Sequence, residues 1–446
     1  MPNTSTPPAL DVSLATTVTD AASRDRAVAR FRDNAIRLPT FAELKDPMSA
    51  PEAVRARAAA ADRHEPDAAN YRVHWYNQFD GNDITAVPEH IELPSAPTGV
   101  KARIVLAFER PIPDDHRAQG VGCLQLSRPA HRDGRLDPTS QRAIWPSTGN
   151  YACSGVAISR IMDCRGVAVL PAGMSQERFD WLNRWTLDPE NDIIRTPGTE
   201  SNVREIYEAC AQLSLDPQNV IINQFCEFAN YLGHREITGD ALATVFEHLS
   251  TGNTRLAAFV SATGSAGTIG AGDHLKQRYG SQIVAAEALE CPTMLENGFG
   301  EHNIQGIGDK HIPLIHNVHN TDAITAISDS ATDQLDVLFQ TEVGRAFLAR
   351  ELGLDAELLS SMRHFGYSSF CNMLSAIAYA HRHDLTEDDM VITVATDGAA
   401  LYDSGRQPII DRDFGGTFTE ADAGRCGPPP RKPGGAHAGR TRPAGP

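Results

Sequence analysis

Short, almost continuously apolar segments alternate with amphipathic ones from residue 103 onward, and this alternation limits the possible folds more than any other feature of the chain. Between the apolar segments, residues 203–213 and 242–249 carry apolar side chains at helical spacing. Apolar strands separated by helices are typical of an α/β protein whose parallel sheets are covered on both faces. We expect strands at 103–108, 166–171, 219–225, 256–262, 282–288, 323–328 and 390–396.

The length of 446 residues is more than one core usually serves, so we expect two open parallel-sheet domains. The predicted division is an N-terminal arm at 1–95 that packs outside the core, α/β domains at 96–235 and 236–415, and a disordered tail at 416–446. Disorder is expected because residues 421–446 contain no Val, Ile, Leu, Met, Phe, Trp or Tyr. Residues 114–133 show neither the helical nor the strand period.

Composition excludes several classes of protein. Hydrophobic residues make up 41% and charged residues 22% of the chain, as in globular proteins. The net charge of −17 disfavours nucleic acid and anionic membranes as partners. No apolar run is long enough for a membrane span, and the first residues do not resemble a secretory signal. The eight cysteines are scattered without a CxxC pair, so we expect reduced thiols, no metal site and a cytoplasmic location.

One loop combines small residues with a predicted helix start. The strand 256–262 runs into Gly264, Ser265, Ala266, Gly267 and Thr268, and a helix follows. Backbone N–H groups at such a junction converge on one point, where the helix dipole favours an anion such as a phosphate. The loop matches neither the Walker motif nor the GxGxxG dinucleotide motif, and a tight turn without a ligand is the alternative.

Four further segments place polar groups where ligands bind in open α/β sheets. Ser147, Thr148, Gly149 and Asn150 precede a helix and suit a carboxylate, although a capping turn explains them equally well. The others are the Asn-Gln-Phe segment with Gln224 at its centre, the glycine-punctuated segment 301–308, and the turn that contains Thr396, Asp397 and Gly398.

The order of these five segments resembles the fold-type-II pyridoxal-phosphate enzymes, which include cysteine synthase, cystathionine β-synthase, threonine synthase and the tryptophan synthase β chain. The resemblance covers about residues 100–415 and includes the segment VLPAGMSQERFDWL. It implies two α/β domains with pyridoxal 5'-phosphate in the cleft between them. It further implies an amino-acid lyase or β-replacement activity of the cysteine synthase type, and a homodimer as the expected assembly.

The resemblance also implies a role for each segment. Residues Gly264 to Thr268 match the cup that holds the cofactor phosphate, and Asn150 matches the residue that binds the cofactor's ring hydroxyl. The loop from Ser147 to Gly149 matches the one that binds the substrate carboxylate, with Gln224 assisting. Relatives place a Ser or Thr against the pyridine nitrogen. This chain has Asp397 or Gly398 there, with Thr396 adjacent, and so departs from the pattern.

The printed sequence has no lysine where that family needs one. Its members bind the cofactor through a lysine that follows the first core strand, and the same amine later takes the substrate's α-proton. Arg117 stands at this position, and a guanidinium stays protonated and cannot replace the amine. Only five of the 40 basic residues are lysines, and we expect none to reach the cleft: Lys45, Lys101, Lys276, Lys310 and Lys432.

Two explanations of Arg117 are open. In the first, the chain is a pseudoenzyme or regulatory subunit that binds the cofactor or an amino acid without chemistry. In the second, a compensated frame shift hides the lysine, because residues 115–120 can be encoded so that a shift of one base reads Thr-Ile-Ala-His-Lys. We favour the second, because it accounts for the missing period at 114–133, and another shift accounts for the Arg/Gly/Pro/Ala composition after about residue 420.

Overall fold

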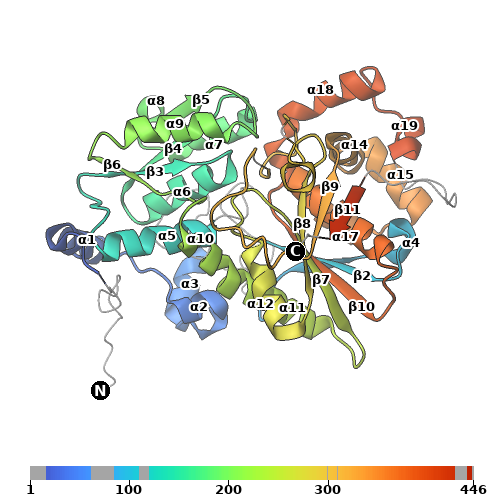
Figure 1. The fold of residues 1–446 in the computed structure, drawn as a ribbon, viewed down its shortest axis with the longest axis horizontal. Coiled ribbons are helices and arrows are strands. Elements are labelled where there is room, and N and C mark those ends of the chain that lie inside the picture. Colours follow the sequence, from blue (N-terminus) through green and yellow to red (C-terminus); the bar gives the residue numbers. More distant parts are fainter. Residues whose placement is uncertain are drawn as a thin grey trace.

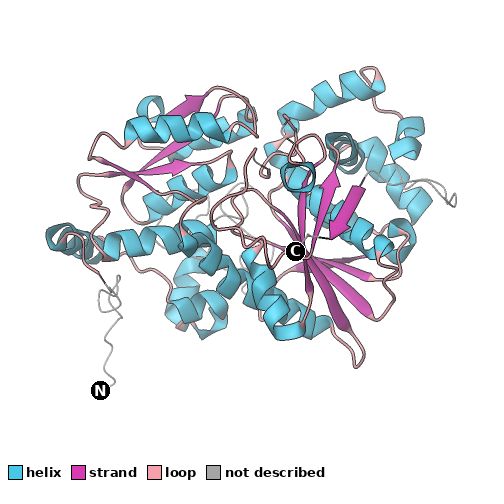
Figure 2. Cartoon of the chain, in the orientation of Figure 1, coloured by secondary structure: helices cyan, strands magenta, loops and turns pink. Residues whose placement is uncertain are grey.

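The computed structural model of the protein describes residues 17–61, 85–109, 120–298, 300–308, 310–426 and 439–443. Two lobes, each built on its own sheet, lie side by side (Figure 1). Helices surround both sheets (Figure 2). The predicted α/β class with two sheet domains is therefore confirmed.

The larger lobe is built on a seven-stranded sheet with the order β1-β2-β10-β7-β8-β9-β11. Its five central strands are parallel, whereas the edge strands β1 and β11 pair antiparallel with β2 and β9. The strands are β1 (His90–Leu93), β2 (Arg103–Phe108), β7 (Arg255–Ala262), β8 (Gln282–Ala288), β9 (Ala323–Ile327), β10 (Asp389–Ala395) and β11 (Gly439–Pro443).

The smaller lobe is built on a parallel sheet with the order β5-β4-β3-β6. Its strands are β3 (Arg142–Pro146), β4 (Arg165–Pro171), β5 (Ile193–Thr196) and β6 (Asn219–Ile221). Its helices are α5 (Gly120–Arg132), α6 (Asn150–Ile161), α7 (Gln176–Trp185), α8 (Pro189–Asp192), α9 (Val203–Leu213) and α10 (Phe228–Gly233). A π-helical turn, His234–Thr238, joins α10 to α11 (Gly239–Leu249) of the larger lobe.

The remaining helices cover the larger sheet and form the N-terminal arm. Those of the larger lobe are α4 (Ser95–Thr98), α12 (Gly270–Tyr279), α13 (Thr293–Glu296), α14 (Asp329–Gln340), α15 (Glu342–Leu352), α16 (Ala356–Met362), α17 (Tyr367–Arg382), α18 (Asp403–Phe414), α19 (Glu420–Cys426) and the 3-10 helix Ala399–Leu401. Those of the arm are α1 (Ala21–Asp33), α2 (Phe41–Lys45), the 3-10 helix Pro47–Ser49 and α3 (Glu52–Ala60).

The central strand β10 shows why the larger sheet is covered on both faces. All seven of its residues are buried. Met390 and Ile392 pack in one cluster with α11 and α12, whereas Val391 packs in a second cluster with α17. Alternate side chains of a strand point to opposite faces, so a strand buried on both faces reads as a continuous apolar run.

All seven strands expected from the sequence form, and six of them end within one residue of the expected bounds. The exception is β6, which stops at Ile221 instead of residue 225. The Asn223 side chain accepts a hydrogen bond from the N–H of Phe225 at 2.9 Å and turns the chain there. An Asn side chain that bonds its own backbone in this way replaces the strand ladder.

The predicted domain division differs from the structure at its N-terminal side. Residues 103–108, assigned to the domain 96–235, form β2, which pairs with β10 in the larger sheet. The arm at 1–95 does not pack outside the core, since Phe31 is fully buried in the same cluster as Trp145 of β3. Its residues 90–93 form β1, which pairs with β2. Local sequence does not show which distant strand completes a sheet.

Two segments predicted to be irregular contain regular structure. Residues 120–132, within the stretch said to lack a period, form α5. Its buried residues Cys123, Ser127, Ala130 and His131 recur at helical spacing, but two of them are polar and hide the pattern. In the predicted tail, residues 420–426 form α19 and residues 439–443 form β11. Backbone pairing with β9 and capping by Asp422 need no large apolar side chain.

All eight cysteines are free thiols, and six of them are buried. Within the described ranges, no group of three or more His, Cys, Asp or Glu is arranged to hold a metal ion. No helix in the described part of the chain is long and apolar enough to cross a membrane.

Candidate functional site

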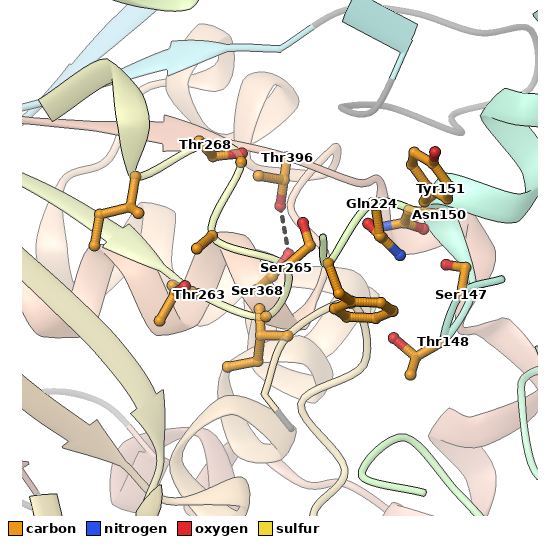
Figure 3. A pocket seen from close by; sticks show the side chains of 18 residues that line it. Ser147, Thr148, Asn150, Tyr151, Gln224, Thr263, Ser265, Thr268, Ser368 and Thr396 are labelled. Atoms are coloured by element: carbon orange, nitrogen blue, oxygen red, sulfur yellow. Dashed lines mark hydrogen bonds between the residues drawn. The ribbon is translucent and has the colours of Figure 1, made fainter. Parts of the chain in front are cut away.

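A solvent-open cleft, with about 650 Å³ of empty space when the adjoining solvent is included, lies where strands of both sheets end (Figure 3). β7 and β10 of the larger lobe and β3 of the smaller lobe all lead into it. The predicted site residues that line it are Ser147, Thr148, Asn150, Gln224, Gly264, Ser265, Ala266, Gly267, Thr268 and Thr396. The structure therefore brings together segments that lie up to 250 residues apart, while their roles toward a ligand stay predictions.

The loop between β7 and α12 forms one wall of this cleft. Ala266 has a φ of 64°, which turns the chain sharply before α12 begins at Gly270. Gly267 lies against Asn230 of α10, and a Cβ at this glycine would be 2.7 Å from the Asn230 Nδ2 atom. The Asn230 amide donates to Ser265 Oγ at 3.3 Å. N–H groups at a helix start attract an anion, so the loop suits a phosphate.

The loop between β3 and α6 forms the opposite wall. Its Gly149 N–H donates to Ser147 Oγ at 2.9 Å. Gly149 has a φ of 148°, a conformation that favours glycine, and it does not line the cleft itself. The Gln224 amide donates to the Pro146 carbonyl at 3.2 Å and joins the end of β3 to the segment after β6. Hydroxyl groups near a helix start can donate hydrogen bonds to a carboxylate.

The turn after β10 is arranged differently from the expectation. Asp397, predicted to contact the cofactor ring, is fully buried and does not line the cleft. Its Oδ1 atom accepts a hydrogen bond from Ser368 Oγ at 2.9 Å, and Ser368 in turn contacts Thr396 Oγ1. Ser368 and Thr396 are the hydroxyl groups that face the cleft from this side (Figure 3).

Sequence reasoning missed Ser368. It is the second residue of the long helix α17, after Tyr367, and no local motif distinguishes it from the other polar residues of that helix. Its partner Asp397 lies 29 residues away in sequence. Only the pairing of α17 with β10 places the two side chains together.

A buried ionic network lies behind the loop Ser147–Asn150. Arg178 of α7 donates to Asn150 Oδ1 at 3.1 Å and to Asp397 Oδ2 at 3.3 Å. It also donates to the Tyr402 hydroxyl at 2.8 Å. Glu200 is fully buried nearby and accepts from the Gly306 N–H at 2.8 Å. Burial raises the pKa of Glu200 to about 7, although the Arg178 charge and the Thr148 hydroxyl oppose this shift.

No lysine lines the cleft among the described residues. The Lys276 Nζ atom forms an ion pair with Asp322 Oδ1 at 2.8 Å, and the Lys45 Nζ atom lies 3.5 Å from Asp240 Oδ1. Lys101 and Lys310 are exposed and absent from the cleft wall. Arg117 and Lys432 lie outside the described residues.

No protein-family model matches the sequence. The chain is 30% identical over 210 residues to a probable cysteine synthase of Bacillus subtilis, in an alignment that covers 46% of this chain and 64% of that protein. It is 27% identical over 262 residues to cysteine synthase B of Campylobacter jejuni, covering 57% and 76% of the two chains. It is 27% identical over 288 residues to cystathionine beta-synthase of Saccharomyces cerevisiae, covering 61% and 52%. The chain thus spans less than two thirds of the Bacillus and yeast proteins.

Solved structures share the fold at low sequence identity. A hydrogen sulfide-producing enzyme from Fusobacterium nucleatum superimposes with a TM-score of 0.58 at 20% identity, covering 70% of this chain and 96% of that one. An O-acetylserine-dependent cystathionine beta-synthase from Helicobacter pylori gives a TM-score of 0.57 at 21% identity, covering 71% and 94%. At such identities the similarity establishes the arrangement of the two sheet domains.

Proposed function

Because the chain belongs to the fold-type-II pyridoxal-phosphate enzymes, the family of the cysteine synthases, we propose that its cleft binds this cofactor and an amino acid. The proposed chemistry is β-replacement or elimination on the amino acid. The observation that carries the proposal is the meeting of a phosphate-type loop and a carboxylate-type loop, one from each lobe, across one cleft. In open α/β sheets ligands bind at such strand ends.

The residues present fit the phosphate end of the cofactor. The loop 264–268 offers backbone N–H groups, and the Thr263 hydroxyl beside it is buried without a hydrogen-bond partner among the described residues. The apolar side chains of Phe225, Ile269 and Ile307 also line the cleft and suit an aromatic ring. When bound, pyridoxal phosphate would supply the electron withdrawal that makes the α-proton of an amino acid acidic.

The smaller lobe would bind the amino acid. Ser147 and Thr148 would bind the α-carboxylate, and Gln224 would hold the loop against the end of β3. Their chemistry is limited to hydrogen bonding, since hydroxyl and amide groups do not take an α-proton at neutral pH. They therefore bind and orient the amino acid, and a different group must accept its α-proton.

We further propose that the chain with Arg117 binds cofactor and amino acid but does not turn over. No described lysine lines the cleft, and an arginine in the family's lysine position supplies no amine for a covalent bond with the cofactor. Such a chain would act as a binding or regulatory subunit. If the gene instead encodes a lysine through the frame shift described above, the same cleft would be an active β-replacement site.

The decisive variant is Arg117→Lys. It should bond covalently to added pyridoxal phosphate and give a visible absorption band that survives desalting, because it returns an amine to the family's lysine position. The wild-type chain and the matched control Arg128→Lys, on α5, should give no such band. Borohydride reduction followed by peptide mass spectrometry identifies the modified residue. A stable band in the wild-type protein would contradict the proposed inactivity.

Phosphate binding is tested with deoxypyridoxine phosphate, a cofactor analogue without a carbonyl group. Gly267→Ala should weaken its affinity roughly tenfold, because the added Cβ would displace Asn230 from the loop. Gly252→Ala is the control, since nothing lies within 4 Å of its added Cβ. Equal affinities of the two variants in equilibrium dialysis would argue against a phosphate site in this loop.

We propose a homodimer as the assembly. Phe228 and Leu232 of α10 are 57% and 50% exposed, and Leu314 is 71% exposed. Tyr231 of α10 packs in the same cluster as Ile315, so these exposed side chains flank one cluster. Exposed apolar patches of this kind mark interaction surfaces. The double variant Leu232→Asp/Leu314→Asp should sediment as a monomer, whereas Leu215→Asp, at a residue 78% exposed, should sediment as the wild type.

A further inference from the structure

Arg178 occupies an unusual place for a charged side chain. It is 0% exposed and lies where α7 of the smaller lobe packs against the 3-10 helix Ala399–Leu401 and α18 of the larger lobe. A buried guanidinium is costly unless its charge and its N–H groups are matched. Here the matching groups come from both lobes, so the side chain connects them.

The contacts of Arg178 converge on two residues of the candidate site. Its Nη2 atom donates to Asn150 Oδ1 at 3.1 Å and to Asp397 Oδ2 at 3.3 Å, while Asn150 Nδ2 donates to the same Asp397 oxygen at 3.1 Å. Its Nη1 atom contacts Gln305 Oε1. Asn150, Asp397 and Arg178 thus form a closed triangle in which both Asn150 amide atoms are used.

This triangle determines the orientation of the Asn150 amide. A rotation by 180° would bring its NH₂ group to the guanidinium and its oxygen to the carboxylate, and both contacts would be repulsive. Arg178 and Asp397 together therefore hold Asn150, the first residue of α6, in one rotamer. The rotamer is set from outside the cleft, because neither Arg178 nor Asp397 lines it.

Arg178 also touches the loop that precedes Asn150. A Cβ added to Gly149 would lie 2.8 Å from Arg178 Nε and 3.1 Å from Cδ and Cζ. The Nε–H group itself is buried and has no hydrogen-bond partner among the described residues. The loop therefore packs closely against the Arg178 side chain at Gly149, whose positive φ favours glycine.

We propose that Arg178 is a positioning residue that holds the loop 147–150 in its amino-acid-binding geometry by joining this loop to the Asp397 turn of the other lobe. The inference rests on the proposed function, since it assigns to the loop the binding of an amino-acid carboxylate. It adds that binding at the loop depends on a side chain outside the cleft. Lysine cannot replace this arginine, because a single ammonium group cannot reach Asn150, Asp397, Tyr402 and Gln305 at once.

The test compares Arg178→Lys and Arg178→Met with Arg184→Met, a control at an exposed position of the same helix. Each protein is saturated with deoxypyridoxine phosphate and titrated with L-serine by calorimetry. L-serine affinity should fall roughly tenfold or more in both Arg178 variants. Deoxypyridoxine phosphate affinity should fall by a smaller factor, because among its expected contacts only the one from Asn150 to the ring hydroxyl depends on Arg178. Equal L-serine affinity in Arg178→Lys and the wild type would overturn the proposal.

A double variant separates positioning from stability. Arg178→Met/Asp397→Asn removes the charges of both residues, so it should recover part of the Tm lost in Arg178→Met, because the buried Asp397 carboxylate is no longer left unpaired. L-serine affinity should not recover, because Asn150 and the loop are no longer held. Recovery of both properties together would mean that Arg178 acts only on stability, and would refute the positioning role.

Hydrogen exchange tests the inference without a ligand. The backbone amides of residues 147–150 should exchange faster in Arg178→Lys than in Arg184→Met, while amides of 264–268 should exchange as in the wild type. Unchanged exchange at 147–150 would overturn the inference. Failure of the wild-type protein to bind L-serine and deoxypyridoxine phosphate would refute the proposed function instead, so the two failures are distinguishable.

Discussion

Replacing Glu200 by glutamine tests most directly the electrostatics of the buried ionic network behind the loop Ser147–Asn150. Glu200 lies between β5 and α9 and is fully buried, and its Oε1 atom accepts the Gly306 N–H of the other lobe at 2.8 Å. Burial raises the pKa of this carboxyl to about 7 from an ordinary value of 4.5, against the opposing effect of Arg178. Glutamine keeps the acceptor oxygen and resembles the protonated acid, so the change removes the titration with little change in shape.

The direction in which stability changes with pH follows from proton linkage. Because the folded-state pKa lies above the unfolded value, the folded protein binds this proton more tightly. The resulting stability is fully present below about pH 4.5 and is lost as the pH rises through about 7. The difference between the folded-state pKa of about 7 and the ordinary value of 4.5 corresponds to about 3 kcal/mol of unfolding free energy. The stability of Glu200→Gln relative to wild type should therefore increase by about that amount between pH 4.5 and pH 8.

The assay is calorimetric unfolding of both proteins at several pH values in that interval. At roughly 1 °C per kcal/mol for a chain of 446 residues, the Tm of the variant relative to wild type should rise by about 3 °C. The comparison of variant and wild type is needed because burial also raises the pKa of Asp329 to about 7 and that of Asp336 to about 6. Glu190→Gln, at an exposed carboxylate, is the control. A constant difference between Glu200→Gln and wild type across the interval would refute the reasoning.

Three further predictions concern packing, a buried histidine and the gene. Gly155→Ala should destabilise the protein by about 1–3 kcal/mol, because its Cβ would overlap the Trp145 ring, and thermal unfolding should show no such loss for Gly252→Ala. Burial lowers the pKa of His131 to about 4, so the wild-type protein loses stability as the pH falls below about 6.5. His131→Leu should reduce this loss, measured as the difference in Tm between pH 7 and pH 5. An unchanged difference would contradict the lowered pKa of His131. Sequencing the gene across codons 110–140 should reveal a one-base displacement, and an in-frame reading with Arg117 would exclude the frame shift.

Much of the fold could be predicted because it depends on local patterns. The apolar runs of β2 and β8 were long and β-rich enough to place both strands correctly to the residue. β5 was not expected, because a four-residue strand that contains Arg195 has no distinctive period. α5 was missed because Ser127 and His131 occupy buried positions where apolar residues normally stand.

The residues of the candidate site also fall into two groups, those that the sequence reveals and those that it does not. Ser265 and Thr148 could be named from sequence, since they stand beside glycines at junctions of strand and helix, where backbone groups are free to bind ligands. Ser368, Arg178 and Glu200 could not, because each acts through partners that are distant in sequence. For the same reason Asp397 was predicted at the cleft surface, whereas it lies behind Ser368.

The sequence by itself determined the α/β class, five of the seven strands of the larger sheet and two of the four of the smaller sheet. It also determined the two ligand-type loops and the absence of a lysine at position 117. Only the tertiary structure decided that β2 joins β10 in the larger sheet and that Phe31 of the arm is part of the core. It also decided that Arg178 joins Asn150 to Asp397 across the two lobes. The reason is physical: strand, turn and helix preferences act between near neighbours in the chain, whereas strand order and buried charge pairs depend on which distant surfaces fold together.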